Sequence, residues 1–124
     1  MRADVKLPAV VSLAAILLAG CCSPSRTVDQ MTIGLWASRQ QLWDEAIYRW
    51  RRALEADPRS AAAHNNLAVA YETKGLWEEA RKAYEAALAL APQNSLIQSN
   101  FSRFKQNLEG RESRGAEPAK KKNP

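Results

Sequence analysis

Two consecutive stretches of the 124-residue chain align without a gap: TVDQMTIGLWASRQQLWDEAIYRWRRALEADPRS, residues 27–60, and AAAHNNLAVAYETKGLWEEARKAYEAALALAPQN, residues 61–94. The alignment superposes residues of similar size and chemistry: Ile33 on Leu67, Leu42-Trp43 on Leu76-Trp77, Glu45-Ala46 on Glu79-Ala80, Trp50 on Tyr84, Ala53-Leu54 on Ala87-Leu88 and Pro58 on Pro92. Such a period predicts one supersecondary unit used twice, with each copy burying a face of its neighbour.

The residue types within each copy predict two helices separated by a turn. Small residues at matched positions let two helix backbones approach, and large residues fill the space beside them. Gly75 suits the end of a first helix, where a left-handed residue is favoured. Pro58 and Pro92 are expected to end the second helices, because proline cannot continue a helix. Glu45 and Glu79 stand in the first turns of those helices, where the helix dipole favours negative charge.

The pattern resembles the tetratricopeptide repeat, a helix-turn-helix unit of 34 residues. The resemblance rests on a large residue at position 7, small residues at positions 8, 20 and 27, an aromatic residue at 24 and proline at 32. In the two copies these are Ile33 and Leu67, Gly34 and Ala68, Ala46 and Ala80, Ala53 and Ala87, Trp50 and Tyr84, Pro58 and Pro92. The resemblance covers residues 27–94 and implies an all-α fold, a short right-handed α-solenoid.

The first copy departs from the family pattern in two places. Gln41 stands where Gly75 stands in the second copy, so we expect a less tight turn there. Trp36-Ala37 reverses the usual small-then-aromatic order, and we expect Trp36 to fill the space that Tyr71 fills in the second copy. An exposed aromatic residue that binds a partner is the alternative. The remaining tryptophans occupy packing positions of the family: Trp43, Trp50 and Trp77.

Residues 95–110, SLIQSNFSRFKQNLEG, carry apolar residues at helical spacing: Ile97, Phe101, Phe104 and Leu108. We expect a capping helix that covers the open face of the second copy, with Asn94 capping its start and Gly110 at its end. The repeat domain then comprises residues 27–110. Stacked repeats usually need about three units to be stable alone, so we expect a weakly stable monomer or a homodimer. Residues 111–124 lack Val, Ile, Leu and aromatic residues, which predicts a disordered basic tail.

The N-terminal segment is expected to direct export. Charged residues within the first six positions precede an uncharged run, LPAVVSLAAILLAG, at residues 7–20. As a helix this run would span about 21 Å, short of the ~30 Å hydrocarbon core of a bilayer. A charged start, a short apolar run and small residues at its end predict a signal peptide at residues 1–20.

Leu18-Ala19-Gly20-Cys21 resembles the bacterial lipobox, which implies cleavage after Gly20 and lipid on Cys21. More than one acyl chain is needed, because each buried CH₂ contributes about 0.8 kcal/mol and a single chain anchors only marginally. Residues 21–26 would then be the lipidated N-terminus and a short linker. The residue after Cys21 is not Asp, which favours an outer-membrane location facing the periplasm. An ordinary cleaved signal peptide with an incidental cysteine is the alternative.

Composition and motifs favour a binding protein over an enzyme. His64 is the only histidine, and no nucleophile, base and orienting residue occur at recognisable spacing. Without a Gly-rich phosphate loop or a His/Cys/carboxylate cluster, we expect no catalytic residue, no cofactor and no metal. The formal net charge of +5 is mild, and an exported protein without a basic binding face is not expected to bind nucleic acid.

Tetratricopeptide domains typically bind proteins or peptides along a concave groove formed by their first helices. The matching positions imply these candidate groove residues: Met31, Leu35 and Arg39 from the first copy, Asn65, Asn66 and Val69 from the second, and Asn100 and Arg103 from the capping helix. Asparagine amides both donate and accept hydrogen bonds, which suits an extended peptide backbone. The carboxylate clamp of co-chaperone repeats needs Lys and Asn where this chain has Met31 and Leu35, so we do not expect a receptor for C-terminal carboxylates.

Three functional hypotheses follow. The first is a membrane-anchored adaptor or scaffold whose groove binds a protein or peptide partner in cell-envelope assembly, such as pilus, secretin, outer-membrane or cell-wall machinery. The second is a self-assembling structural envelope lipoprotein. The third is a surface-binding module that uses the lysines of the tail, Lys120 to Lys122, on a lipid or cell-wall polymer. The repeat resemblance favours the first.

Overall fold

The structure, a computed structural model, describes residues 25–115 and contains five α-helices in that range. They are α1 (Ser25–Arg39), α2 (Trp43–Ala56), α3 (Ala61–Thr73), α4 (Trp77–Leu90) and α5 (Ser95–Gly115). The prediction of an all-α fold with two helix pairs and one further helix is confirmed. The predicted signal peptide, Cys21 and residues 116–124 lie outside the described residues. Within residues 25–115, no helix combines the length and hydropathy that a membrane span requires.

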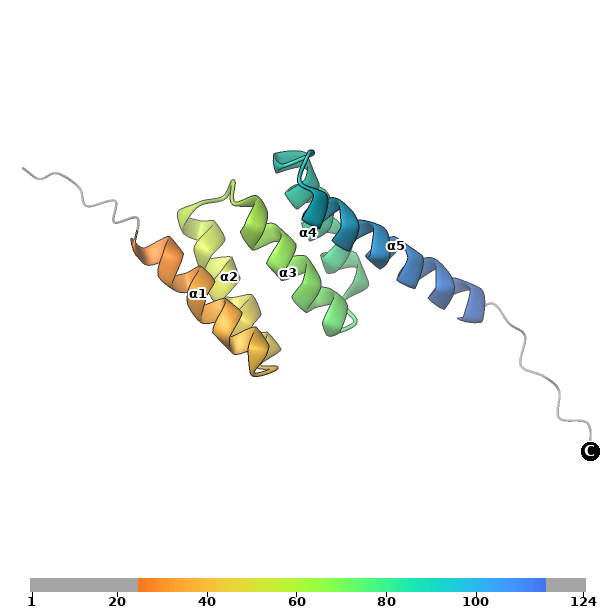
Figure 1. Ribbon diagram of the computed structural model, residues 1–124. Helices are drawn as coiled ribbons and strands as arrows, with labels where there is room; N and C mark the ends of the chain where they lie inside the picture. Colours follow the sequence, from red (N-terminus) through yellow and green to blue (C-terminus); the bar gives the residue numbers. More distant parts are fainter. Residues whose placement is uncertain (1–24, 116–124) are drawn as a thin grey trace, which may run out of the picture.

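The helices form two layers (Figure 1). In that view α1, α3 and α5 lie in the nearer layer, and α2 and α4 lie behind them. Each second helix packs on the first helix of its own repeat and on the helix that follows it: α2 contacts α1 and α3, and α4 contacts α3 and α5. Helix α5 therefore takes the place of the first helix of a third repeat and covers α4, as expected for a capping helix.

The core consists of alanines packed around a few aromatic rings. The rings of Trp50 and Tyr84 are buried next to small residues that are fully inaccessible to solvent: Ala46, Ala53, Ala80 and Ala87. Gly34 shows why position 8 must be small, because a Cβ atom placed on it would lie only 2.7 Å from Cδ1 of Trp50. Helices α1 and α2 can therefore approach at this point only because Gly34 has no side chain.

Two polar side chains cap the helices that follow the proline turns. The Ser60 hydroxyl accepts a hydrogen bond from the N–H of Ala63 at 3.2 Å, at the start of α3. Asn94 Oδ1 accepts two backbone N–H groups at the start of α5, at 3.1 Å and 3.2 Å. Each bond satisfies a donor that a helix leaves without an intrahelical partner. The predicted N-cap at Asn94 is confirmed.

The turns inside the two repeats share one geometry, so the expectation of a looser turn at Gln41 was wrong. Gln41 has φ 60° and Gly75 has φ 74°, both in the left-handed region. In each turn the next backbone N–H donates to a carbonyl five residues earlier at 2.9 Å, Leu42 to Ala37 and Leu76 to Tyr71. The packed helix pair dictates the turn, and Gln41 adopts a conformation that costs a non-glycine residue about 1–2 kcal/mol.

Helix α5 continues through Gly110 to Gly115, which corrects two predictions. The capping helix does not end at residue 110, and residues 111–115 of the predicted disordered tail are helical. One glycine inside a helix costs only about 1 kcal/mol, and local contacts offset this cost. The Arg111 guanidinium lies 4.4 Å from the ring centroid of Trp77, and Arg114 Nε donates to the carbonyl of Gly110 at 2.8 Å.

Trp36 is exposed, so the prediction that it fills the Tyr71 space was wrong. Its exposed fraction is 57%, whereas Ala37, at the position equivalent to Tyr71, is fully buried. Neighbouring residues on a helix point about 100° apart, so Trp36 cannot reach the space beneath Ala37. The other tryptophans follow the prediction, because Trp50 is buried and Trp43 and Trp77 pack against the core.

Replacing the strained glutamine should stabilise the domain. We expect Gln41→Gly to raise the free energy of unfolding by about 1 kcal/mol, because glycine adopts a positive φ without a steric penalty. Gly75→Ala at the equivalent position is the matched control and should lower it by a similar amount. Urea denaturation followed by circular dichroism measures both. An unchanged midpoint for Gln41→Gly would show that the left-handed conformation carries no strain.

Candidate peptide-binding groove

A hollow of about 350 Å³ lies where the nearer layer of helices exposes its surface, and we call it the groove. Side chains from four helices line it: Leu35, Ser38, Trp43, Trp50, Asn65, Asn66, Val69, Leu96, Asn100 and Arg103. Six of the predicted groove residues are among them. Residues from the two repeats and from α5 therefore meet at one surface, as the repeat pattern predicted.

A second hollow of about 440 Å³ adjoins the groove. Its lining comes from α1 alone, namely Met31, Thr32, Leu35, Trp36 and Arg39. Leu35 borders both hollows. The two remaining predicted residues, Met31 and Arg39, therefore extend the groove along α1, and a ligand in the groove can reach them without leaving the surface.

Four lining residues are not among the eight candidates: Ser38, Trp43, Trp50 and Leu96. The two tryptophans belong to α2, and their family positions indicated packing only. Their rings extend far enough between α1 and α3 to reach the groove as well. Leu96 could have been found from the sequence, because Leu96, Asn100 and Arg103 follow a spacing of four and three residues that places them on one face of α5.

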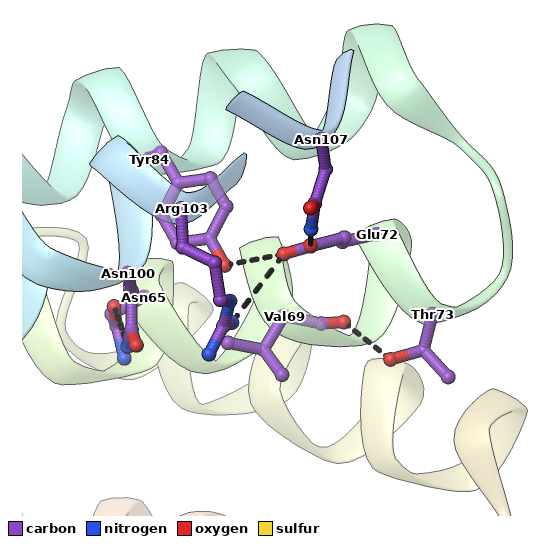
Figure 2. Close-up of polar contacts among 8 residues, drawn as sticks. All are labelled: Asn65, Val69, Glu72, Thr73, Tyr84, Asn100, Arg103 and Asn107. Atoms are coloured by element: carbon purple, nitrogen blue, oxygen red, sulfur yellow. Dashed lines mark hydrogen bonds and ion pairs between the residues drawn. The ribbon is translucent and has the colours of Figure 1, made fainter. Parts of the chain in front are cut away.

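An amide pair joins α3 of the second repeat to α5 at the groove. Asn100 Nδ2 donates to Asn65 Oδ1 at 3.1 Å across α3 and α5 (Figure 2). Asn65 is only 6% exposed, so this bond satisfies an acceptor that burial removes from water. Asn65 thus positions α5, and half-buried Asn66 is the better placed of the two asparagines to meet a ligand.

Glu72 on α3 contacts the groove residue Arg103 and side chains of α4 and α5. Its carboxylate accepts hydrogen bonds from the hydroxyl of Tyr84 at 2.9 Å and from Nδ2 of Asn107 at 3.1 Å. Arg103 lies 3.7 Å from the same carboxylate, and Figure 2 shows the three side chains converging on it. Since the side chain of Glu72 is only 13% exposed, these contacts compensate its desolvation and hold Arg103 at the groove.

Burial and the neighbouring Glu72 carboxylate raise the pKa of the Tyr84 hydroxyl far above its usual value. Both causes disfavour the ionised phenolate, the first by removing it from water and the second by charge repulsion. Tyr84 therefore stays protonated and remains a hydrogen-bond donor to Glu72. The donor belongs to the core, so the groove electrostatics depend directly on core packing.

The groove offers three kinds of contact. Leu35, Val69 and Leu96 provide apolar surface, and Asn66 provides an amide donor and acceptor. Arg103 supplies positive charge within the groove, and Arg39 supplies it in the adjoining hollow. Such a surface can hold a peptide backbone, an apolar side chain and a carboxylate at the same time.

The chain matches the tetratricopeptide repeat family over residues 32–95, more than half of its length. The helix pairs, the shared turn geometry and the buried small residues agree with this match. The chain belongs to the tetratricopeptide repeat family.

Two curated relatives are protein O-mannosyl-transferases. The chain is 33% identical over 73 residues to human TMTC1, across 59% of this chain and 8% of that protein. It is 38% identical over 58 residues to mouse TMTC4, across 47% of this chain and 8% of that protein. The chain therefore spans less than a tenth of the length of these relatives. A solved structure, the first TPR of Spaghetti (RPAP3) bound to the HSP90 peptide SRMEEVD, is similar with a TM-score of 0.40 and 21% identity, over 68% of this chain and 94% of that one.

Removing the Tyr84 hydroxyl should change stability in a pH-dependent way. At pH 7 we expect Tyr84→Phe to lower the free energy of unfolding by about 1.5 kcal/mol, because Glu72 loses a donor. The raised pKa of Tyr84 in the folded state means that its contribution is complete below pH ~10, where unfolded tyrosine titrates, and is lost above it.

The difference in free energy of unfolding between the native protein and Tyr84→Phe should therefore stay constant from pH 7 to 9. Above pH ~10 this difference should shrink, by up to about 1.4 kcal/mol per pH unit. Urea unfolding at each pH measures it. Tyr48→Phe removes an exposed hydroxyl and should leave the free energy of unfolding unchanged at every pH. A constant difference up to pH 11 would contradict the proposed coupling of Tyr84 to Glu72.

Proposed function

We propose that the groove binds an extended segment of a partner protein and that the chain serves as a membrane-anchored adaptor in cell-envelope assembly. The role is binding rather than catalysis. The observation that carries the proposal is the convergence of apolar, amide and guanidinium side chains from α1, α3 and α5 in one open hollow of about 350 Å³. Membership of the tetratricopeptide repeat family supports a protein or peptide as the ligand.

The chemistry of the groove indicates what kind of segment it takes. Its apolar residues Leu35, Val69 and Leu96 favour a partner side chain that is aliphatic or aromatic. Arg103 and Glu72 form an ion pair in which the two charges offset each other, so Arg39 in the adjoining hollow supplies the net positive charge of this surface. A segment that combines an apolar residue with an acidic one is therefore the expected ligand.

Loss of the groove should abolish partner capture from the native envelope. We expect mild crosslinking of the full-length protein to recover at least one envelope protein, and Leu35→Glu/Asn66→Ala to reduce its yield by about tenfold or more, because a buried unpaired charge costs at least 1.4 kcal/mol. Quantitative mass spectrometry of the crosslinked material is the measurement.

The matched control is Leu76→Glu/Gln93→Ala. Leu76 is 38% exposed and Leu35 is 40% exposed, and neither Leu76 nor Gln93 lines the groove. The control should capture the partner like the unmodified protein. If both the groove variant and the unmodified protein yield only self-crosslinks, the groove is not a receptor and the self-assembling structural role replaces the adaptor role.

The proposed anchor is lipid on Cys21. Its support is the sequence Leu18-Ala19-Gly20-Cys21, which resembles the lipobox and follows the apolar run of the predicted signal peptide. Helix α1 begins at Ser25, four residues after this cysteine. Four extended residues reach roughly 14 Å, so the anchor would hold the repeat domain close to the bilayer, with an outer-membrane location proposed.

Replacement of the anchor cysteine should abolish lipid attachment. We expect Cys21→Ser to prevent lipidation and cleavage after Gly20, because the thioether needs a thiol. Intact mass spectrometry should show the lipid-modified mature protein for the native sequence and for Cys22→Ser, which keeps Cys21. An unmodified Cys21 in protein isolated from its own membrane would exclude the lipoprotein proposal and leave the groove proposal intact.

A further inference from the structure

The 34-residue register aligns one residue from each repeat with one from α5, and these three residues differ in burial. Trp36 on α1, Ala70 on α3 and Phe104 on α5 occupy the same repeat position. Ala70 and Phe104 are fully buried, whereas Trp36 is 57% exposed. This difference is unexpected from side-chain size, because tryptophan and phenylalanine are both large aromatic residues.

The preceding helix explains the burial of this position. α3 packs on α2, and α5 packs on α4. The ring of Phe104 lies 6.2 Å from the ring of Trp77 and 5.3 Å from that of Tyr84, both on α4. In the described part of the chain no helix precedes α1. Trp36 therefore belongs to the same kind of stacking surface, but without the helix that covers it elsewhere.

The two ends of the solenoid differ in chemistry. At the α5 end, charged residues of α4 and α5 accompany the apolar ones around a hollow of about 300 Å³, and Lys105 Nζ lies 5.0 Å from the ring of Phe101. At the opposite end Trp36 is joined by Leu42, which is 49% exposed. Trp36 also borders hollows of about 440 Å³ and 650 Å³ on its two sides. The α5 end suits solvent, whereas the α1 end presents an uncovered aromatic residue.

We propose that the α1 end, centred on Trp36, binds an α-helix of a partner protein that lies on α1 as α4 lies on α5. By analogy with Trp77, Ala80 and Tyr84, this helix presents large apolar residues seven positions apart with a small residue between them. Asp29 on α1 is exposed, whereas the residues at the equivalent position of α3 and α5, Ala63 and Ile97, are buried. The partner helix is therefore expected to carry a basic residue opposite Asp29. Binding of a partner helix goes beyond the peptide-binding function proposed for the groove, although Trp36 also lines the hollow that extends the groove along α1.

Two other occupants fit the surface less well. A second copy of the chain offers no free helix of the required kind within residues 25–115, because α2 and α4 are already covered by α3 and α5. A bilayer would meet the carboxylates of Asp44 and Glu45, which line the hollow beside Trp36. Burial of these charges against lipid is unfavourable. A partner helix with polar edges satisfies both the aromatic centre and the charged margin.

The test inserts a second copy of residues 77–94, α4 with its following turn, between Arg26 and Thr27 of the full-length chain. Because residue 95 and residue 27 are equivalent in the repeat, the inserted helix enters in register with α1. We expect the melting temperature to rise by about 5 °C or more, as for any added packing of about 1 kcal/mol. The same insertion should leave the melting temperature of the Trp36→Asp variant unchanged. The matched control is an insert in which the copies of Trp77 and Tyr84 are both replaced by serine.

Each outcome decides the proposal. An increase that requires both Trp36 and the aromatic residues of the insert supports it. No increase, or an increase with the serine insert, overturns it, because the surface then does not recognise the pattern that covers Phe104. Sedimentation of the full-length protein in detergent over a wide concentration range adds a second criterion. Self-association that Trp36→Asp abolishes would assign the surface to a second copy and overturn the partner-helix proposal.

Discussion

The close approach of paired helices around a single buried aromatic ring is the constraint on which the rest of the structure depends. Trp50 in the first repeat packs against Gly34, which has no side chain. Tyr84 in the second repeat is buried against the rings of Phe101 and Phe104, and the small positions of both repeats hold fully buried alanines. Packing at interior density tolerates no additional atom at such a point. The same constraint propagates to the turns, where Gln41 adopts a left-handed conformation because the helix pair leaves no other connection.

The buried rings also connect the core to the proposed ligand surface. The Tyr84 hydroxyl donates to Glu72, and Glu72 in turn holds Arg103 at the groove. Trp50 lines the groove as well as the core, and its indole N–H donates to the carbonyl of Met31 at 3.4 Å. A binding surface supported in this way is preorganised, because the side chains that face the ligand are positioned by residues that cannot move independently.

The solenoid is short, and its ends therefore make up a large part of its surface. One end is closed by α5, whose burial of Ile97 and Phe104 replaces the contacts that a third repeat would make. The other end leaves Trp36 uncovered. The groove and the α1 end are therefore the two surfaces for which we propose ligands, and they meet at the hollow lined by Leu35 and Trp36.

The 34-residue pattern of large, small and proline residues was enough to predict the fold class and the helix pairs, because it repeats the packing positions of both helices in each copy. It also placed all eight candidate groove residues along two adjoining hollows. Three features became evident only in the folded molecule: Trp36 is exposed, α5 continues to Gly115, and Asn100 and Arg103 contact Asn65 and Glu72 respectively. These features depend on contacts between residues more than 30 positions apart or on a missing neighbour, and a local pattern contains neither.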